Sequence, residues 1–179
     1  MTTTETTLLD EILPDFDVAA KYTIRIQASP ERIYHILQNG IPTGALTRLL
    51  MLLRGIPRIF RKEECADYSF YKLKQSQARE IVIGIIGQFW KPAATTVEIN
   101  SLDEFMNFQR NGFSKAALNL RIISQQNGSS LLSTETRVVS FGAAKEKFGM
   151  YWRFIKPFSA MIRREILRKI KKQAEAVYN

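Results

Sequence analysis

The sequence predicts an α+β fold in which a curved antiparallel sheet of about six or seven strands is covered by one long C-terminal helix. Residues 20–140 contain runs of β-branched and aromatic residues, several of them alternating with polar ones, as in half-buried strands. Residues 148–177 instead repeat apolar side chains every three or four positions, as on one face of a helix. Such a helix is about 45 Å long at 1.5 Å per residue, which is enough to cover the concave face of the sheet.

The C-terminal helix is predicted to have an apolar stripe and a basic side. The stripe consists of Phe148, Trp152, Ile155, Ile162, Ile166, Ile170, Ala174 and Val177. The opposite side is assigned Arg153, Lys156, Arg163, Arg164, Arg168, Lys169, Lys171 and Lys172. Pro157 falls inside the pattern and predicts a kink, because proline removes a backbone donor.

At the other end of the chain, residues 1–17 predict a tail or a short helix ahead of a single domain at 18–179. The apolar residues of this segment have helical spacing before Pro14, and they are Leu8, Leu9, Ile12 and Leu13. Residues 20–28 then alternate as a strand, with three apolar residues on one side, namely Tyr22, Ile24 and Ile26.

Two short helices are expected after this first strand. One begins after Ser29, a typical N-cap residue, with Pro30 at the first helical position, and covers 30–38. The other covers 44–54, between a proline and a glycine-proline turn.

The middle of the chain predicts the remaining strands. Segments 68–73, 80–89 and 95–100 have strand composition, and 101–108 resembles a short helix opened by a capping box. Segments 116–124 and 131–140 are joined through Asn127-Gly128, which is a strong hairpin signal.

Length and composition indicate one ordinary globular domain. The 179 residues include no apolar run long enough to span a membrane, and the first residues lack the features of a secretory signal. The one cysteine, Cys65, suits a reducing compartment, so we expect a cytoplasmic location. The net charge of +9 is concentrated in residues 145–179 and 41–62, which favours a surface partner more than an evenly spread charge would.

The order of elements, with Ser29-Pro30-Glu31-Arg32-Ile33-Tyr34 directly after the first strand, resembles the SRPBCC superfamily. This superfamily has the helix-grip fold of START domains, birch-pollen-allergen-like proteins and polyketide cyclase-like proteins. Segments 79–90 and 133–137 and the pair Tyr151-Trp152 resemble a bacterial subgroup. The resemblance covers residues 18–176 and implies an apolar cavity between the sheet and the long helix, but it names no ligand.

Strand alternation and the helix stripe, together with this resemblance, give a predicted cavity lining. Its residues are Phe70, Gly84, Val97, Ile99, Leu120, Thr134, Thr136, Phe148, Tyr151, Trp152 and Ile155. Almost all are apolar, and the few hydroxyl groups would orient a guest, as in small-molecule pockets. The alternative is a solid core filled by the same aromatic residues, with Gly84 serving only to let the sheet bend.

Polar residues give no convincing catalytic or metal site. Glu135 and Arg137 share one face of a strand, and Asn119 and Arg121 share a face of its hairpin partner. Inside the cavity they would bind a carboxylate, but the alternation favours an exposed network on the outer face. His35 is the single histidine and suits a helix surface. We therefore predict no catalytic residue, no metal and no cofactor.

A basic, apolar stretch lies at the second short helix. The resemblance implies a cavity gate here, and the charge also suits an anionic membrane surface; the residues are Leu49, Leu50, Leu53 and Arg54. A simple solvated face is the alternative. No motif for nucleic acid is present, so nucleic acid is not expected as a partner.

Three functions remain open. The leading hypothesis is binding or transport of a hydrophobic small molecule, such as a lipid, an isoprenoid or a polyketide-like compound, in the internal cavity. An aromatase/cyclase-type enzyme would use the same cavity, with an Arg or Tyr assisting. An interaction module would instead dock on an anionic membrane or a protein through its basic faces. The sequence does not specify the oligomeric state.

Overall fold

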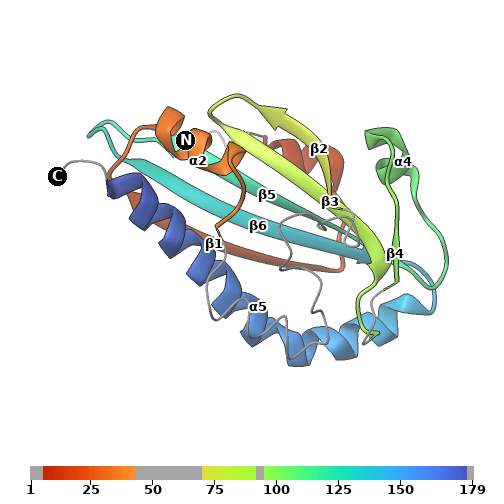
Figure 1. Cartoon of the computed structure of the whole chain (residues 1–179). Helices are drawn as coiled ribbons and strands as arrows, with labels where there is room; N and C mark the ends of the chain where they lie inside the picture. The colour runs from red at the N-terminus through yellow and green to blue at the C-terminus, as the bar shows by residue number, and fades with distance from the viewer. Residues whose placement is uncertain (1–5, 43–69, 92–94, 177–179) are drawn as a thin grey trace.

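The computed structural model describes residues 6–42, 70–91 and 95–176 (Figure 1). The elements in chain order are α1 (Leu8–Ile12), β1 (Val18–Ile26), α2 (Pro30–Gln38), β2 (Tyr71–Ser76), β3 (Glu80–Gln88), β4 (Thr95–Val97), α4 (Leu102–Asn107), β5 (Ser114–Ser124), β6 (Ser130–Ser140) and α5 (Ala144–Glu175). The predicted α+β class, with a long C-terminal helix on an antiparallel sheet, is confirmed. The predicted helix at 44–54 lies outside the described residues.

Six antiparallel strands form one curved sheet. Five of them follow the order β1-β6-β5-β3-β2, and β4 pairs with β3. The sheet is open, because β1 and β2 lie at opposite ends of this order and do not pair. The β5–β6 hairpin is in register along its whole length, from Ser114 opposite Ser140 to Ser124 opposite Ser130. Its turn contains Gly128 at φ 73°, a conformation that glycine adopts without strain.

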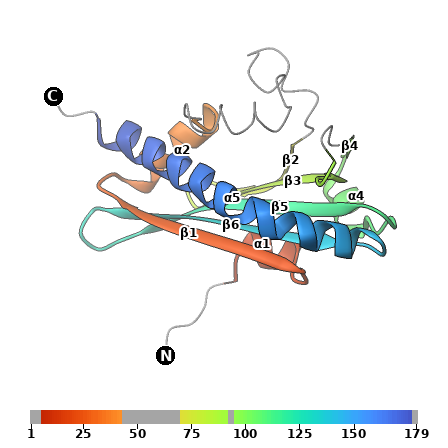
Figure 2. The same ribbon diagram turned by 90° about the horizontal axis from the view of Figure 1, so that it is seen from below.

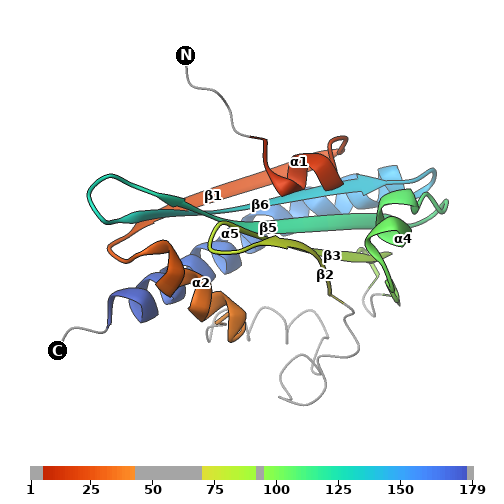
Figure 3. The ribbon, with the colours of Figure 1, turned by 90° about the horizontal axis from the view of Figure 1, so that it is seen from above.

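Strand pairing divides the side chains between two faces, because residues paired across strands point the same way. We call one the helix-side face; it carries Ile24, Leu132, Ile122 and Ile81 and packs against α2 and α5. We call the other the α1-side face; it carries Val82 and packs beneath α1 and α4. Figure 3 shows α1 and α4 in front of the sheet and α5 behind it.

Local sequence sets the ends of the short helices. The hydroxyl of Ser29 accepts a hydrogen bond from the backbone of Arg32 and caps α2, and Ser101 caps α4 by accepting from Glu104. The N-terminal segment forms α1, whose buried residues Leu9 and Ile12 pack on the sheet. The residues of α1 therefore form part of a second hydrophobic core, on the α1-side face of the sheet.

The long helix α5 crosses the helix-side face diagonally (Figure 2). It is continuous through Pro157, so the proline is accommodated inside one helix rather than ending it. In the described part of the chain, no helix is both long enough and apolar enough to cross a membrane.

Candidate functional site

The long helix packs tightly against the rest of the domain only near its two ends. Its buried residues are Ala144 and Phe148 at one end and Leu167, Ile170 and Ala174 at the other. Between Phe148 and Leu167, every residue of α5 keeps part of its surface exposed. The middle of the helix therefore lies over the sheet without the dense packing of a finished core.

Aromatic side chains gather at the N-terminal end of this stretch. The ring of Phe148 lies edge-on to Phe89 at 6.3 Å between centroids and stacks with Trp152 at 6.0 Å. Tyr151 adds a tilted contact at 5.9 Å. Because Phe148 is 3 % exposed whereas Tyr151 and Trp152 are half-buried, the cluster has a closed base and an accessible side.

The half of the sheet farther from α5 also presents partly exposed apolar side chains. They lie on β3 and β5, on the helix-side face, and they are Ile81, Ile83, Ala116 and Leu118. Thr134 and Thr136 of β6 lie beside them and are buried. The helix-side face thus carries an apolar surface with a few hydroxyl groups.

The cation of Arg163 lies at the interface between α5 and the sheet. Arg163 of α5 donates from Nη1 to the hydroxyl of Thr136 and from Nε to that of Ser159, the latter over 3.3 Å. The residue as a whole is half-buried, but protein atoms enclose its guanidinium group. Burial lowers the pKa of Arg163 to about 10, and neighbouring Tyr22 offsets only part of that decrease.

This position corrects the sequence prediction, which put Arg163 on the outer, basic side of the helix. The missed signal is its spacing: Arg163 comes three residues before Ile166 and seven before Ile170, so it lies in line with the apolar stripe.

Seven residues of the predicted cavity lining lie on the two facing surfaces. On the sheet they are Leu120, Thr134 and Thr136, and on α5 they are Phe148, Tyr151, Trp152 and Ile155. Leu120 is paired with Thr134 and is 4 % exposed, at the tightly packed end. Of the others, Tyr151, Trp152 and Ile155 lie in the loosely packed middle of α5, and Thr136 contacts Arg163 there.

Four residues of the predicted lining lie elsewhere, and these placements are corrections. Phe70 precedes β2 and is 58 % exposed. Val97, Ile99 and Gly84 belong to the α1-side face, where Ile99 packs in the core with Phe105 of α4. Alternation misplaced Val97 and Ile99 because β4 ends at Val97 after only three residues, and it misplaced Phe70 because β2 begins only at Tyr71.

Gly84 has a structural reason to be a glycine. A Cβ added there would lie 2.6 Å from Leu73 and 2.9 Å from Phe105. The missing side chain therefore makes room for the core beneath α4 and does not contact the helix-side face.

The predicted gate residues Leu49, Leu50, Leu53 and Arg54 lie outside the described residues, as does Cys65. His35 is exposed on α2, where its Nδ1 lies 3.3 Å from the side-chain amide of Asn39. Within the described ranges, no three His, Cys, Asp or Glu side chains are grouped to hold a metal ion.

No family model matches the chain, and no curated protein matches it in sequence. Solved structures match it in fold. The di-domain ARO/CYC StfQ from the steffimycin biosynthetic pathway aligns with a TM-score of 0.51 at 11 % identity, over 94 % of this chain and 54 % of StfQ. The chain has a helix-grip fold. The fold resemblance inferred from the sequence is thereby confirmed.

The chain spans about half the length of StfQ, with 54 % of that protein covered. Proteins from Chromobacterium violaceum and Thermus thermophilus also align with the chain. They align with TM-scores of 0.40 and 0.38 at 10 % and 8 % identity. They cover 88 % and 90 % of this chain, and 97 % and 100 % of their own chains.

On the α1-side face of the helix-grip domain, a charged network is buried that the sequence led us to expect on the surface. Arg137 donates to Asp10, Glu135 and the carbonyl of Leu13. Asn119 donates to Glu80 over 2.6 Å, and Glu80 also accepts from the backbone of Leu8. Alternation placed these residues on the correct face, but α1 covers that face and buries them. The network joins α1 to the sheet.

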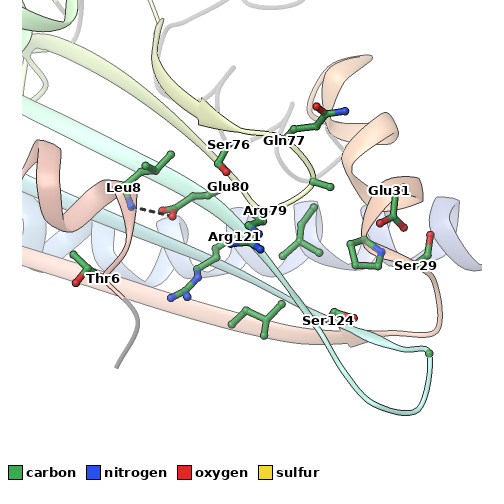
Figure 4. Close-up of a pocket in the computed structure, with 15 residues that line it drawn as sticks. Thr6, Leu8, Ser29, Glu31, Ser76, Gln77, Arg79, Glu80, Arg121 and Ser124 are labelled. Carbon is green, nitrogen blue, oxygen red and sulfur yellow. Dashed lines mark hydrogen bonds between the residues drawn. The ribbon is translucent and has the colours of Figure 1, made fainter. Parts of the chain in front are cut away.

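The helix-grip domain also has an open pocket of about 760 Å³ at the end of the sheet near α2 (Figure 4). Its walls come from α1, the start of α2, the β2–β3 turn and the β5–β6 hairpin. Charges of both signs line it, including Arg79, Arg121, Glu31 and Glu80. Its mixed polarity contrasts with the apolar surface that faces α5.

Proposed function

We propose that the protein binds a hydrophobic small molecule between the sheet and the middle of α5. The observation that carries the proposal is the pattern of burial along α5, which packs tightly near both ends and loosely between Phe148 and Leu167. On the same face of the sheet, β3 and β5 present partly exposed isoleucine and leucine side chains. A guest that covered them would gain roughly 25 cal/mol for each Å² of apolar surface removed from water.

A binding role fits these residues better than catalysis does. The helix-side positions of β1, β3, β5 and β6 carry apolar and hydroxyl side chains, without a carboxylate or an imidazole among the described strand residues. General acid–base chemistry would need such groups within hydrogen-bond reach of the substrate. We therefore place a carrier or sensor first and an aromatase/cyclase-type enzyme second. StfQ is described as an ARO/CYC, and the likeness to it is one of fold.

Native mass spectrometry of the freshly purified protein, followed by organic extraction, tests the proposal. We expect a stoichiometric hydrophobic adduct that is lost in Trp152→Ala, because Trp152 lies beside the proposed guest. Phe154→Ala is the matched control, since that aromatic residue is 77 % exposed on the same helix. An adduct retained by Trp152→Ala would contradict the proposed location. No adduct, even after incubation with fatty acids and polyketide mimics, would contradict the function itself.

A second candidate function, docking on an anionic membrane, is favoured by the outer side of α5. Four large apolar side chains are exposed at helical spacing, namely Met150, Phe154, Phe158 and Met161, at 56 %, 77 %, 45 % and 44 %. The following turns carry Arg164, Arg168 and Lys172, which line a shallow hollow of about 430 Å³ next to Met161. Apolar residues that enter the lipid and cations at the head groups together suit an anionic bilayer.

Vesicle sedimentation tests this second candidate. We expect binding to vesicles that contain phosphatidylglycerol, weaker binding to phosphatidylcholine alone, and a loss with added salt. Phe154→Ser should reduce binding, whereas Phe70→Ser should not. Phe70 is also exposed, at 58 %, but it precedes β2, at the opposite edge of the sheet from β1, against which α5 packs. Equal binding to both vesicle types, or no effect of Phe154→Ser, would exclude this surface.

A further inference from the structure

Arg163 differs from Arg137, a buried arginine of the described residues, in how its charge is balanced. Arg137 is 8 % exposed and lies against two carboxylates, with 2.6 Å to Asp10 and 2.8 Å to Glu135. The acceptors of Arg163 among the described residues are two hydroxyl groups, those of Thr136 and Ser159. One enclosed guanidinium is thus neutralised by the protein, and the other is not neutralised within the described part of the chain.

Such a charge is costly unless an anion balances it. Removing a guanidinium from water is unfavourable, and hydroxyl acceptors return only part of the lost hydration. The group nevertheless stays protonated at neutral pH, since its pKa of about 10 remains well above 7. If Arg163 served packing alone, an apolar residue in line with the stripe would do so without this cost. The arrangement is therefore suited to receiving an anion.

The location of Arg163 adds a second argument. It lies in the loosely packed middle of α5, opposite the sheet residues assigned to ligand binding under the proposed function. Its guanidinium has five N–H donors, of which Nε and one on Nη1 have acceptors among the described residues. Tyr22 lies on β1, next to β6, where it is paired with Thr134, and its hydroxyl interacts electrostatically with Arg163. Arginine and hydroxyl donors are thus present at the edge of an apolar surface.

We propose that Arg163 binds the carboxylate of an amphipathic monoanionic ligand, such as a fatty acid or another long-chain acid, whose apolar tail lies along β3, β5 and Trp152. The assignment deepens the proposed function and rests on it. A guanidinium matches a carboxylate because two parallel N–H donors face two oxygens.

Calorimetric titration with dodecanoic acid, dodecanol and methyl dodecanoate tests the assignment. The wild-type protein should bind the acid about ten to a hundred times more tightly than the alcohol or the ester, as for a hydrogen bond to a charged group. Arg163→Gln should lower the affinity for the acid to that for the alcohol and leave the affinity for the alcohol unchanged. Arg163→Lys should keep part of the preference, because it keeps the positive charge but loses the two parallel N–H donors of the guanidinium. Arg168→Gln is the control, since Arg168 is exposed on the same helix.

The outcomes separate the two proposals. If the acid and the alcohol bind equally to the wild-type protein, or if Arg163→Gln keeps the preference, the head-group assignment is wrong and the hydrophobic site stands. If none of the three probes binds, both proposals are overturned for ligands with a dodecyl chain. The preference of the wild-type protein should also vanish as the pH falls through the pKa of the free acid, which a purely structural role for Arg163 would not produce. Circular dichroism of each variant confirms that it is folded.

Discussion

Arg137 of β6 donates from Nη2 to Oδ1 of Asp10 over 2.6 Å, and this pair fastens α1 to the α1-side face of the sheet. The same guanidinium reaches the carbonyl of Leu13 over 3.1 Å and Glu135 over 2.8 Å. A short helix near the N-terminus is thereby held by one side chain from the sixth strand. This face is the one turned away from the proposed ligand, so the network contributes to stability and leaves the helix-side face free for function.

Breaking this network should destabilise the domain. Arg137→Met removes the cation from between Asp10 and Glu135 at a partly buried site, where Lys21 remains 3.5 Å from Glu135. We expect a loss of about 3 kcal/mol in the free energy of unfolding, at the lower end for a buried pair because the Asp10 side chain is 39 % exposed. Urea unfolding measures it. A loss below about 0.5 kcal/mol would show that the network contributes no more than a surface pair.

Asp10 should make stability depend on acid pH. Burial alone would raise its pKa, but hydrogen bonds from Thr7 and from Arg137 lower it from 3.8 to about 2. The folded state thus favours the ionised carboxyl, and this stabilisation is complete above pH 4 and is lost as the pH falls toward 2. Urea unfolding between pH 5 and pH 2 should give a shallower decline for Asp10→Asn. Asp15→Asn, at an exposed site, should follow the wild type.

Gly84 should not tolerate a methyl group. The added Cβ of Gly84→Ala would lie 2.6 Å from Leu73 Cδ1 and 2.9 Å from Phe105 Cε2, and Phe105 is fully buried. We expect a loss of about 1–3 kcal/mol from overpacking. Gly149→Ala is the matched control, because an added Cβ has no neighbour within 4 Å on α5 and alanine favours a helix. Equal melting temperatures for the two variants would contradict this account.

Lys115 should stabilise the C-terminal end of α4. Its Nζ donates to the carbonyls of Phe105 and Met106 over 3.0 and 2.6 Å, and the residue is 5 % exposed. Lys115→Met would leave both carbonyls without that donor, at a cost of about 1–3 kcal/mol. Burial also lowers the pKa of Lys115, so the folded state binds its proton less tightly than the unfolded state does. The wild type should therefore gain stability as the pH rises toward 10.5, and the variant should lack that gain.

Sequence reasoning succeeded where pattern and length were both strong. The alternation in β1, β5 and β6 placed Tyr22, Leu120 and Thr136 on the correct face, because long paired strands keep a strict period of two. The Asn127-Gly128 turn set the β5–β6 register. The α5 stripe gave the long helix to within a few residues at each end.

It failed where a contact between distant segments decides the outcome. Val97 and Ile99 were misplaced because three residues of β4 are too few to fix a face. The cover that α1 provides for Arg137 depends on packing between residues more than a hundred positions apart. Arg163 was assigned to the basic side of the helix because basic residues follow it in the sequence. Its spacing to Ile170 is the signal that it faces the sheet.

Thr136 should act on the ligand through Arg163. Its hydroxyl accepts a hydrogen bond from Nη1 of Arg163, so Thr136→Val keeps the shape of the side chain and frees the guanidinium from the sheet. We expect the preference for dodecanoic acid over dodecanol to fall severalfold, less than in Arg163→Gln, because the charge stays while its orientation loosens. Thr134→Val is the control, two residues earlier on the same face and also buried. Equal losses in the two variants would mean that polarity of the β6 surface, rather than the position of Arg163, sets the preference.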